Sequence, residues 1–352
     1  MNDSSGGFME RSIVQLTLVR FREFIRQPEA VFWTFIFPIL LAVGLGLAFR
    51  SKAPDKPKIG IIASTPAAAG IAASLKKDST LIVEELSDSA GARSLRTAKI
   101  ALLVVPDNDG VRYVFDPQRD ESVFARLVTD RAIQTAAGRV DPVKITERRV
   151  TERGARYIDF VIPGLLGMNL MGSGVWGIGF AIVDSRSKRL LKRFMATPMS
   201  RAEYLMAFLL SRLFFLILEV VTLLGFGALA FGVPLRGSLV ELGVICLLSA
   251  LSFSALGLLI ASRAKTVEGV SGLMNFVMLP MWIFSGVFFS SSNFPKMVQP
   301  IVKALPLTAV NDALRANMLE GTKITALGLE MAVIVTWLIV SFVLALKLFR
   351  WR

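Results

Sequence analysis

Six separate stretches of the chain are apolar over about 20 residues, the length that a helix needs to cross the hydrocarbon core of a bilayer. They cover residues 30–49, about 157–183, 207–233, 239–262, 269–290 and 326–349. A helix in lipid satisfies its backbone groups within its own segment, so each stretch can span alone. The pattern predicts an all-α membrane bundle of six transmembrane helices.

Basic residues gather on one side of these predicted spans, as they do in the cytoplasmic loops of membrane proteins. Four clusters lie at residues 11–26, 186–201, 263–265 and 347–352. The short connection between the third and fourth spans, residues 234–238, carries only Arg236. Six spans place all four clusters in the cytoplasm, so we expect a bacterial inner membrane protein with both termini cytoplasmic.

The sequence contains no histidine and one cysteine, Cys246. This composition excludes Ser-His-Asp triads, histidine-based zinc sites and intrachain disulfides. An intramembrane protease or lipid transferase would need a nucleophile with a matched base, and no serine of the spans has one. The net charge of +13 follows from the cytoplasmic clusters, so it does not indicate a nucleic-acid partner. We expect no catalytic residue, no metal site and no cofactor bound by this chain.

Two segments lie outside the predicted spans. Residues 1–29 form an amphipathic helix that we expect in the cytoplasmic interface, and Pro28 separates it from the first span. Residues 50–156 are polar. They contain strand-like runs at 58–63, 81–85, 100–105 and 111–115 and helical stretches at 67–76 and 121–137. This pattern predicts a small α/β extracytoplasmic domain inserted after the first helix.

The connection between the second and third spans carries a short amphipathic helix. Its apolar stripe consists of Leu190, Leu191, Phe194 and Met195, and its basic residues are Arg186, Lys188, Arg189, Lys192 and Arg193. Thr197 and Pro198 end the helix, because proline cannot continue it. From the residues alone, this helix lies either on lipid headgroups or in the groove of a partner protein.

Four polar residues lie within the predicted spans. Glu219 is near the middle of the third span, where a carboxylate costs roughly 2.5 to 3.5 kcal/mol on insertion scales. Arg212 precedes it on the same helix face, about 10 Å away along the axis. Glu219 either pairs with another helix or contacts a cationic substrate in the pathway. Asn169 and Asn275 are interpreted as interhelical hydrogen-bonding residues.

The loop with the double leucine resembles the coupling helix of type-2 ABC exporter permeases. That family's pattern runs close to Leu-Leu-x-x-x-x-Ala-Thr-Pro-x-Ser-x-x-Glu-Tyr, and residues 190–204 match it in order and spacing. Arg26-Gln-Pro28, Ile162-Pro-Gly164 and the stretch 293–315 also resemble the family. The resemblance covers nearly the whole chain, most closely residues 158–352. One departure is the more basic run at 184–189.

In this family the coupling helix sits in a groove of a separate ATPase subunit, and ATP binding moves it. The resemblance therefore implies that residues 157–352, with the first span at 30–49, form the permease of an ATP-driven exporter. It implies an ABC ATPase subunit that binds ATP and magnesium, and a second permease chain, so that the permease is a homodimer in membrane lipid. This sequence has no G-x-x-x-x-G-K-[ST] phosphate loop, so we expect no enzyme activity from it. A lipophilic or amphiphilic cargo, such as a drug or a lipid, is expected.

The segment before the last span, about residues 291–321, is apolar and rich in proline. Pro295, Pro300 and Pro306 would interrupt any long helix, so we expect short helices that dip part-way into the membrane. The resemblance implies that these prolines, with Asp312 and Arg315, form an outer gate.

An alternative function remains from the residues alone. A membrane-anchored sensor or scaffold could bind a ligand through its extracytoplasmic domain. That hypothesis explains residues 50–156, but it does not explain the pattern of the cytoplasmic loop.

Overall fold

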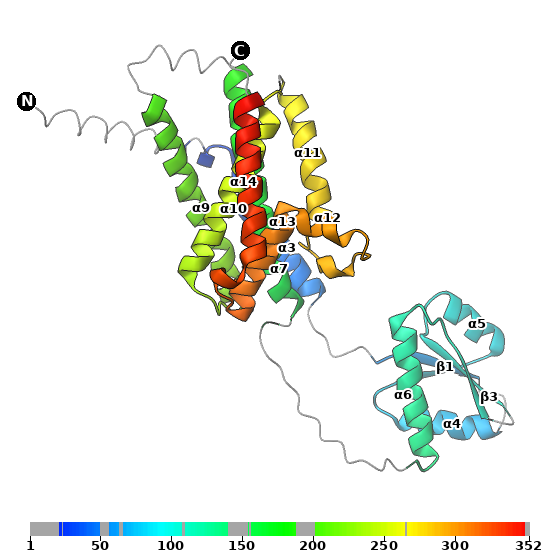
Figure 1. The fold of residues 1–352 in the computed structure, drawn as a ribbon. Coiled ribbons are helices and arrows are strands. Elements are labelled where there is room, and N and C mark those ends of the chain that lie inside the picture. Colours follow the sequence, from blue (N-terminus) through cyan, green and yellow to red (C-terminus); the bar gives the residue numbers. More distant parts are fainter. Residues whose placement is uncertain are drawn as a thin grey trace, which may run out of the picture. The chain divides into compact units, whose positions relative to one another are not determined.

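The computed structural model describes residues 21–22, 24–49, 56–62, 66–107, 110–139, 154, 156–187, 201–264 and 266–348. The chain forms two compact units (Figure 1). The first combines residues 1–51 and 151–352, and the second covers residues 52–150. The second unit is therefore an insertion in the sequence of the first.

Six helical segments of the first unit are long and apolar enough to cross a membrane. They are α2–η1–α3 (Pro28–Val31, Phe32–Ile36, Phe37–Ala48), α7 (Tyr157–Ser187), α9 (Arg201–Phe231), α10 (Leu239–Ala261), α11 (Val267–Phe284) and α14 (Gly328–Leu348). The predicted fold class is thereby confirmed. One helix is shorter than expected, because Gly286 takes a left-handed φ of 71° and ends α11 at Phe284 instead of near residue 290.

The centre of the first unit is α7, with α10 packed along it and α14 packed along α10 (Figure 1). Every residue from Val161 to Met171 of α7 is buried. Further along the same helix, Gly177 and Phe180 are exposed. Near Tyr157, α7 is thus buried on every side, whereas beyond Ser173 it has an exposed side and a buried side on which Gly174 and Gly179 closely approach α10 and α11.

Short helices fill the segment between α11 and α14. They are η2 (Ser291–Asn293), α12 (Gln299–Ala304), α13 (Pro306–Arg315), η3 (Ala316–Glu320) and η4 (Ile324–Ala326). Pro300 and Pro306 lie in the first turns of α12 and α13, where the missing N–H costs no helical hydrogen bond. α13 packs against α7 and α14 and is buried on almost every side.

The inserted unit is a small α/β domain. Its elements are β1 (Lys58–Ile62), α4 (Pro66–Lys77), β2 (Ile82–Leu86), α5 (Asp88–Arg96), β3 (Leu102–Asp107), β4 (Gly110–Val114) and α6 (Asp120–Ala136). The sheet order is β2-β1-β3-β4, with β1 parallel to β2 and β3, and with β4 antiparallel to β3. One sheet face packs on α4 and α6 around Ile59 and Leu102, and α5 covers Leu103 on the other. The core of this unit is closed by its own residues.

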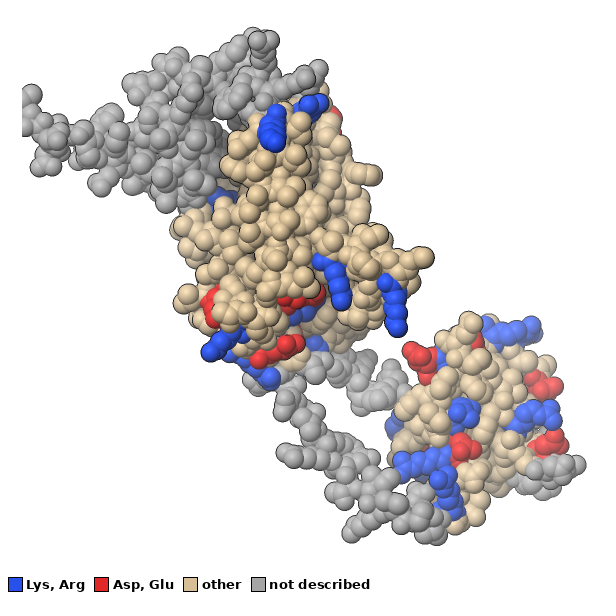
Figure 2. Space-filling view, in the orientation of Figure 1, with Lys and Arg blue, Asp and Glu red and all other residues tan. Residues whose placement is uncertain are grey.

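Charged side chains are distributed differently on the two units. Figure 2 shows a broad band of the first unit without Lys, Arg, Asp or Glu, and these residues gather toward its ends. On the inserted unit, basic and acidic side chains are interspersed over the visible face. The bare band is the surface that a helix bundle presents to lipid, and the mixed surface is typical of a domain in water.

Candidate functional site

Most of the candidate coupling segment lies outside the described residues. This holds for Lys188, Arg189, Leu190, Leu191, Lys192, Arg193, Phe194, Met195, Thr197 and Pro198. Arg186 falls in the last turn of α7, where the structure describes the backbone. On either side of this segment, α7 ends at Ser187 and α9 begins at Arg201. The loop therefore joins two antiparallel helices of the bundle.

Near the middle of these two helices, a buried charge pair of α9 is connected to α7 through Ser173. Glu219 of α9 is 2% exposed. Its Oε1 lies 3.3 Å from Nη1 of Arg212, and its Oε2 accepts a hydrogen bond of 2.9 Å from Oγ of Ser173 in α7. Nη2 of Arg212 also donates to Oγ of Ser173, at 2.8 Å. We call Ser173, Arg212 and Glu219 the inner bridge.

The inner bridge gives the charge of Glu219 a partner inside the bundle, the usual arrangement for intramembrane carboxylates. The predicted 10 Å along the helix axis is spanned by the long arginine side chain. The Nε atom of Arg212 has no hydrogen-bond partner among the described residues. Glu219 is thus paired with a cation of its own helix and is hydrogen-bonded to α7 only through Ser173.

The two candidate asparagines have different surroundings. Nδ2 of Asn169 donates a 3.1 Å hydrogen bond to the carbonyl oxygen of Thr34 in the π-helical turn η1. Pro38 follows Thr34 by four residues and has no N–H to occupy that oxygen. Asn275 of α11 is exposed and has no side-chain hydrogen bond within the described ranges. Only Asn169 is thus placed as an interhelical contact.

Arg315 connects the candidate outer gate to α7. Its Nε donates 3.2 Å to the carbonyl of Phe160, and its guanidinium lies 3.6 Å from the centre of the Phe160 ring. Nη2 donates to the carbonyl of Gly286, and Nη1 lies 3.7 Å from Oδ1 of Asp312. Arg315 therefore holds α13, the loop after α11 and the beginning of α7 together.

Two glycines of α7 allow this close packing. A Cβ on Gly164 would lie 2.5 Å from the carbonyl oxygen of Val287, and one on Gly167 would overlap Oδ1 of Asn311. Nδ2 of Asn311 donates 2.8 Å to the carbonyl of Ser285. Among the gate prolines, Pro306 is buried, whereas Pro295 and Pro300 are exposed.

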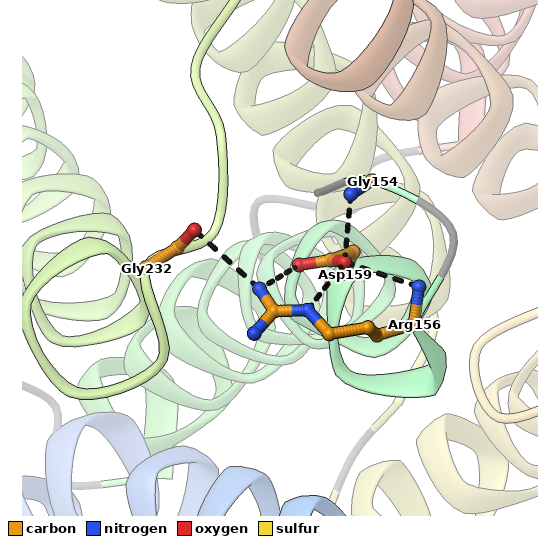
Figure 3. Close-up of polar contacts among 4 residues, drawn as sticks. All are labelled: Gly154, Arg156, Asp159 and Gly232. Atoms are coloured by element: carbon orange, nitrogen blue, oxygen red, sulfur yellow. Dashed lines mark hydrogen bonds and ion pairs between the residues drawn. The ribbon is translucent and has the colours of Figure 1, made fainter. Parts of the chain in front are cut away.

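A second polar contact between α7 and α9 lies at their other ends (Figure 3). Asp159 of α7 is fully buried, and its Oδ2 accepts hydrogen bonds from the backbone N–H groups of Gly154 and Arg156, at 2.9 and 3.1 Å. Nε and Nη2 of Arg156 donate to the two carboxylate oxygens at 2.9 and 2.7 Å. Nη2 also donates 3.4 Å to the carbonyl of Gly232, just after α9. We call these four residues the outer latch.

The outer latch follows from local helix chemistry. Asp159 is the third residue of α7, and an acidic side chain there can accept the N–H of the residue before the helix. Gly232 has a left-handed φ of 63°, which ends α9 beside this site. The hydrogen bonds to Asp159 raise the pKa of Arg156, so this guanidinium stays charged. Sequence reasoning missed the latch, although an aspartate at the third helix position is a recognisable signal.

The described polar groups hold helices together, and their geometry is not that of a reaction centre. Within the described ranges, no three His, Cys, Asp or Glu side chains lie close enough to hold a metal ion. Cys246 is buried in α10.

Comparison with known proteins gives a consistent result. Residues 29–347 match the family model described as ABC-2 family transporter protein. The chain is 26% identical over 205 residues to the inner membrane transport permease YadH of Escherichia coli K12, a stretch that covers 56% of this chain and 75% of the relative. It is 24% identical over 163 residues to "Probable multidrug ABC transporter permease YbhS" of the same strain, which covers 46% of this chain and 43% of YbhS. It is 26% identical over 115 residues to Nodulation protein J of Neorhizobium galegae, a stretch that covers 33% of this chain and 44% of the relative.

Proposed function

The chain belongs to the ABC-2 transporter family and is a membrane permease of an ABC transporter, and from this premise we propose that it forms the pathway of an ATP-driven exporter. The observation that carries the proposal is the family match over residues 29–347, which includes the six candidate spans except for Pro28 and Leu348. The proposed cargo is a lipophilic or amphiphilic molecule, such as a drug or a lipid.

Membership of this family implies an ABC ATPase partner. We place the contact with that partner on residues 184–204, where basic side chains surround the apolar stripe of Leu190, Leu191, Phe194 and Met195. A short amphipathic helix suits docking into a groove of another protein. Because the loop joins α7 to α9, a displacement of the docked helix would reach both spans directly. ATP and magnesium are assigned to the partner.

The cargo class is supported by the way polar groups are used inside the bundle. The inner bridge and the Asn169–Thr34 contact pair polar groups with one another. The side of α7 that no other helix of this chain covers is largely apolar. On this side, a Cβ on Gly172 or Gly177 would meet nothing within 4 Å. We propose that this side contributes to the pathway, facing a second copy of the chain. The gate of α12 and α13 would then control release at the outer surface.

The membrane orientation belongs to the same proposal. The basic clusters at the ends of the predicted spans place the loop 184–204 and both termini in the cytoplasm. The inserted α/β unit then lies on the extracytoplasmic side, and lipid surrounds the apolar band of the bundle.

The proposal is tested by purifying the chain with a candidate ABC ATPase from a neighbouring gene. The complex, reconstituted in proteoliposomes, is assayed for ATP hydrolysis and for export of a lipophilic dye and of a fluorescent phospholipid. We expect a stable complex whose ATPase rate rises with one of these amphiphiles. A chain that purifies without any ATPase, while its extracytoplasmic domain binds a ligand, would favour the sensor hypothesis instead.

A further inference from the structure

The antiparallel helices α7 and α9 are joined by polar contacts at two positions along their axes. The outer latch lies at the beginning of α7 and the end of α9, and the inner bridge lies further toward their connecting loop. Asp159 and Ser173 are 14 residues apart on α7, and Glu219 and Gly232 are 13 residues apart along α9 and its end. At 1.5 Å per residue, both intervals are about 20 Å. The two contacts therefore divide the helix pair into an outer and an inner part.

The outer contact is built for rigidity. Asp159 is fully buried and accepts four hydrogen bonds, two of them from backbone N–H groups that have little freedom to move. Close to it, a Cβ on Gly227 of α9 would lie 3.1 Å from a side-chain carbon of Ile162, so the two helices pass very near each other. The hydroxyl of Tyr157 donates 2.8 Å to the carbonyl of Phe288, which adds a third attachment at this end.

The inner contact is looser. The inner bridge uses side chains only, whereas backbone N–H groups take part in the outer latch. Around the bridge, Leu213, Ile217 and Leu218 of α9 are exposed. A region with fewer buried contacts moves at a lower free-energy cost. A force on the connecting loop will therefore displace the inner end of α9 before it displaces the outer end.

We propose that Arg156 and Asp159 are positioning residues that fix the outer end of α9 to α7, so that α9 pivots there when its inner end is displaced. This inference rests on the proposed function, because the displacement comes from the loop 184–204. Arg156 is the essential tie, since its Nη2 contacts both Asp159 and the carbonyl of Gly232. A lysine there keeps the positive charge beside Asp159, but it has one nitrogen and cannot form this fork.

The pivot is tested with spin-label distances in the full permease–ATPase complex, on a Cys246→Ala background. One pair, Leu213→Cys with Arg263→Cys, reports the inner ends of α9 and α10. The other pair, Leu229→Cys with Val240→Cys, reports their outer ends, and all four positions are exposed. α10 serves as the reference because it packs along α7 in the core.

Addition of ATP with vanadate is expected to change the inner distance and to leave the outer distance unchanged. Arg156→Gln is expected to broaden the outer distance distribution and to make it respond to nucleotide, and Arg156→Lys should do so to a smaller degree. Arg112→Gln, which removes an exposed ion pair of the inserted unit, is the matched control and should behave as wild type. Arg156→Lys keeps the charge, so it remains informative if the glutamine variant does not assemble.

Two results would overturn the pivot while leaving the exporter function intact. One is an outer distance that changes as much as the inner distance in the wild-type complex. The other is an outer distance that neither Arg156 variant alters. If neither distance responds to nucleotide in a complex that hydrolyses ATP, the proposed coupling itself fails, and the pivot fails with it.

Discussion

Nδ2 of Asn169 lies 3.1 Å from the carbonyl oxygen of Thr34, so a side chain of α7 donates to the backbone of the π-helical turn in the first span. In a membrane this contact matters, because water is not available to satisfy polar groups there.

Asn169→Leu is expected to lower the free energy of unfolding by about 0.6 kcal/mol, the average for interhelical hydrogen bonds in membranes, and by no more than about 1.7 kcal/mol. Thermal unfolding in detergent measures the change. Asn275→Leu is the matched control, since Asn275 is exposed. Equal stability of Asn169→Leu and wild type would contradict the role of this contact.

The double substitution Leu191→Glu and Phe194→Glu is expected to abolish ATP-driven export while the protein still inserts. Two carboxylates on the apolar stripe would be desolvated in any groove that receives it. Export of the fluorescent amphiphile per ATP hydrolysed is the measurement. Leu127→Glu, at an exposed position of α6, controls for the added charge. Unchanged export by the loop variant would remove the docking role of this segment.

We expect the losses of unfolding free energy caused by substitutions in the inner bridge to be strongly non-additive. Arg212→Leu leaves the carboxylate of Glu219 buried without its cation, and we expect a loss of about 3 kcal/mol in unfolding free energy. Arg212→Leu combined with Glu219→Leu should be less destabilised than the sum of the two single changes, because no buried charge remains. Thermal unfolding of the four proteins provides the cycle. Additive losses would mean that the two charges do not interact across 3.3 Å.

The glycines of α7 give a matched set within one helix. Gly164→Ala and Gly167→Ala place a methyl group against the carbonyl of Val287 and the amide of Asn311, and each is expected to cost about 1 to 3 kcal/mol. Gly172→Ala meets nothing within 4 Å and should be neutral or slightly stabilising, since alanine favours helix. The order of melting temperatures tests the prediction. A Gly172→Ala variant that loses export while remaining stable would place Gly172 in the pathway.

The six spans were predictable because their signal is local. Each is an apolar run long enough to span the membrane, and it can be recognised without knowing which helices it packs against. The end of α11 was harder to predict, because residues 285–289 continue the apolar pattern. The helix stops there because Gly286 adopts a left-handed conformation. α5 was missed for a different reason, since its residues Asp88–Arg96 are mostly small and polar and include few large apolar side chains.

The polar contacts show where sequence reasoning ends. Glu219 and Arg212 share a helix face, so their proximity follows from helix geometry. Ser173, which binds both, is 46 residues away from Glu219 along the chain, and no spacing rule connects them. The outer latch is likewise only partly predictable. The cap formed by Asp159 is local in sequence, but the contact of Arg156 with Gly232 depends on how two spans pack.

The inserted α/β unit begins and finishes between the same two consecutive spans, and it closes its own core. Adding or removing such a unit leaves the order and direction of every membrane helix unchanged. Evolution can therefore exchange this part without redesigning the rest, and a gene for this transporter can be engineered in the same way. We expect the membrane helices to fold normally when a fluorescent protein replaces residues 56–139.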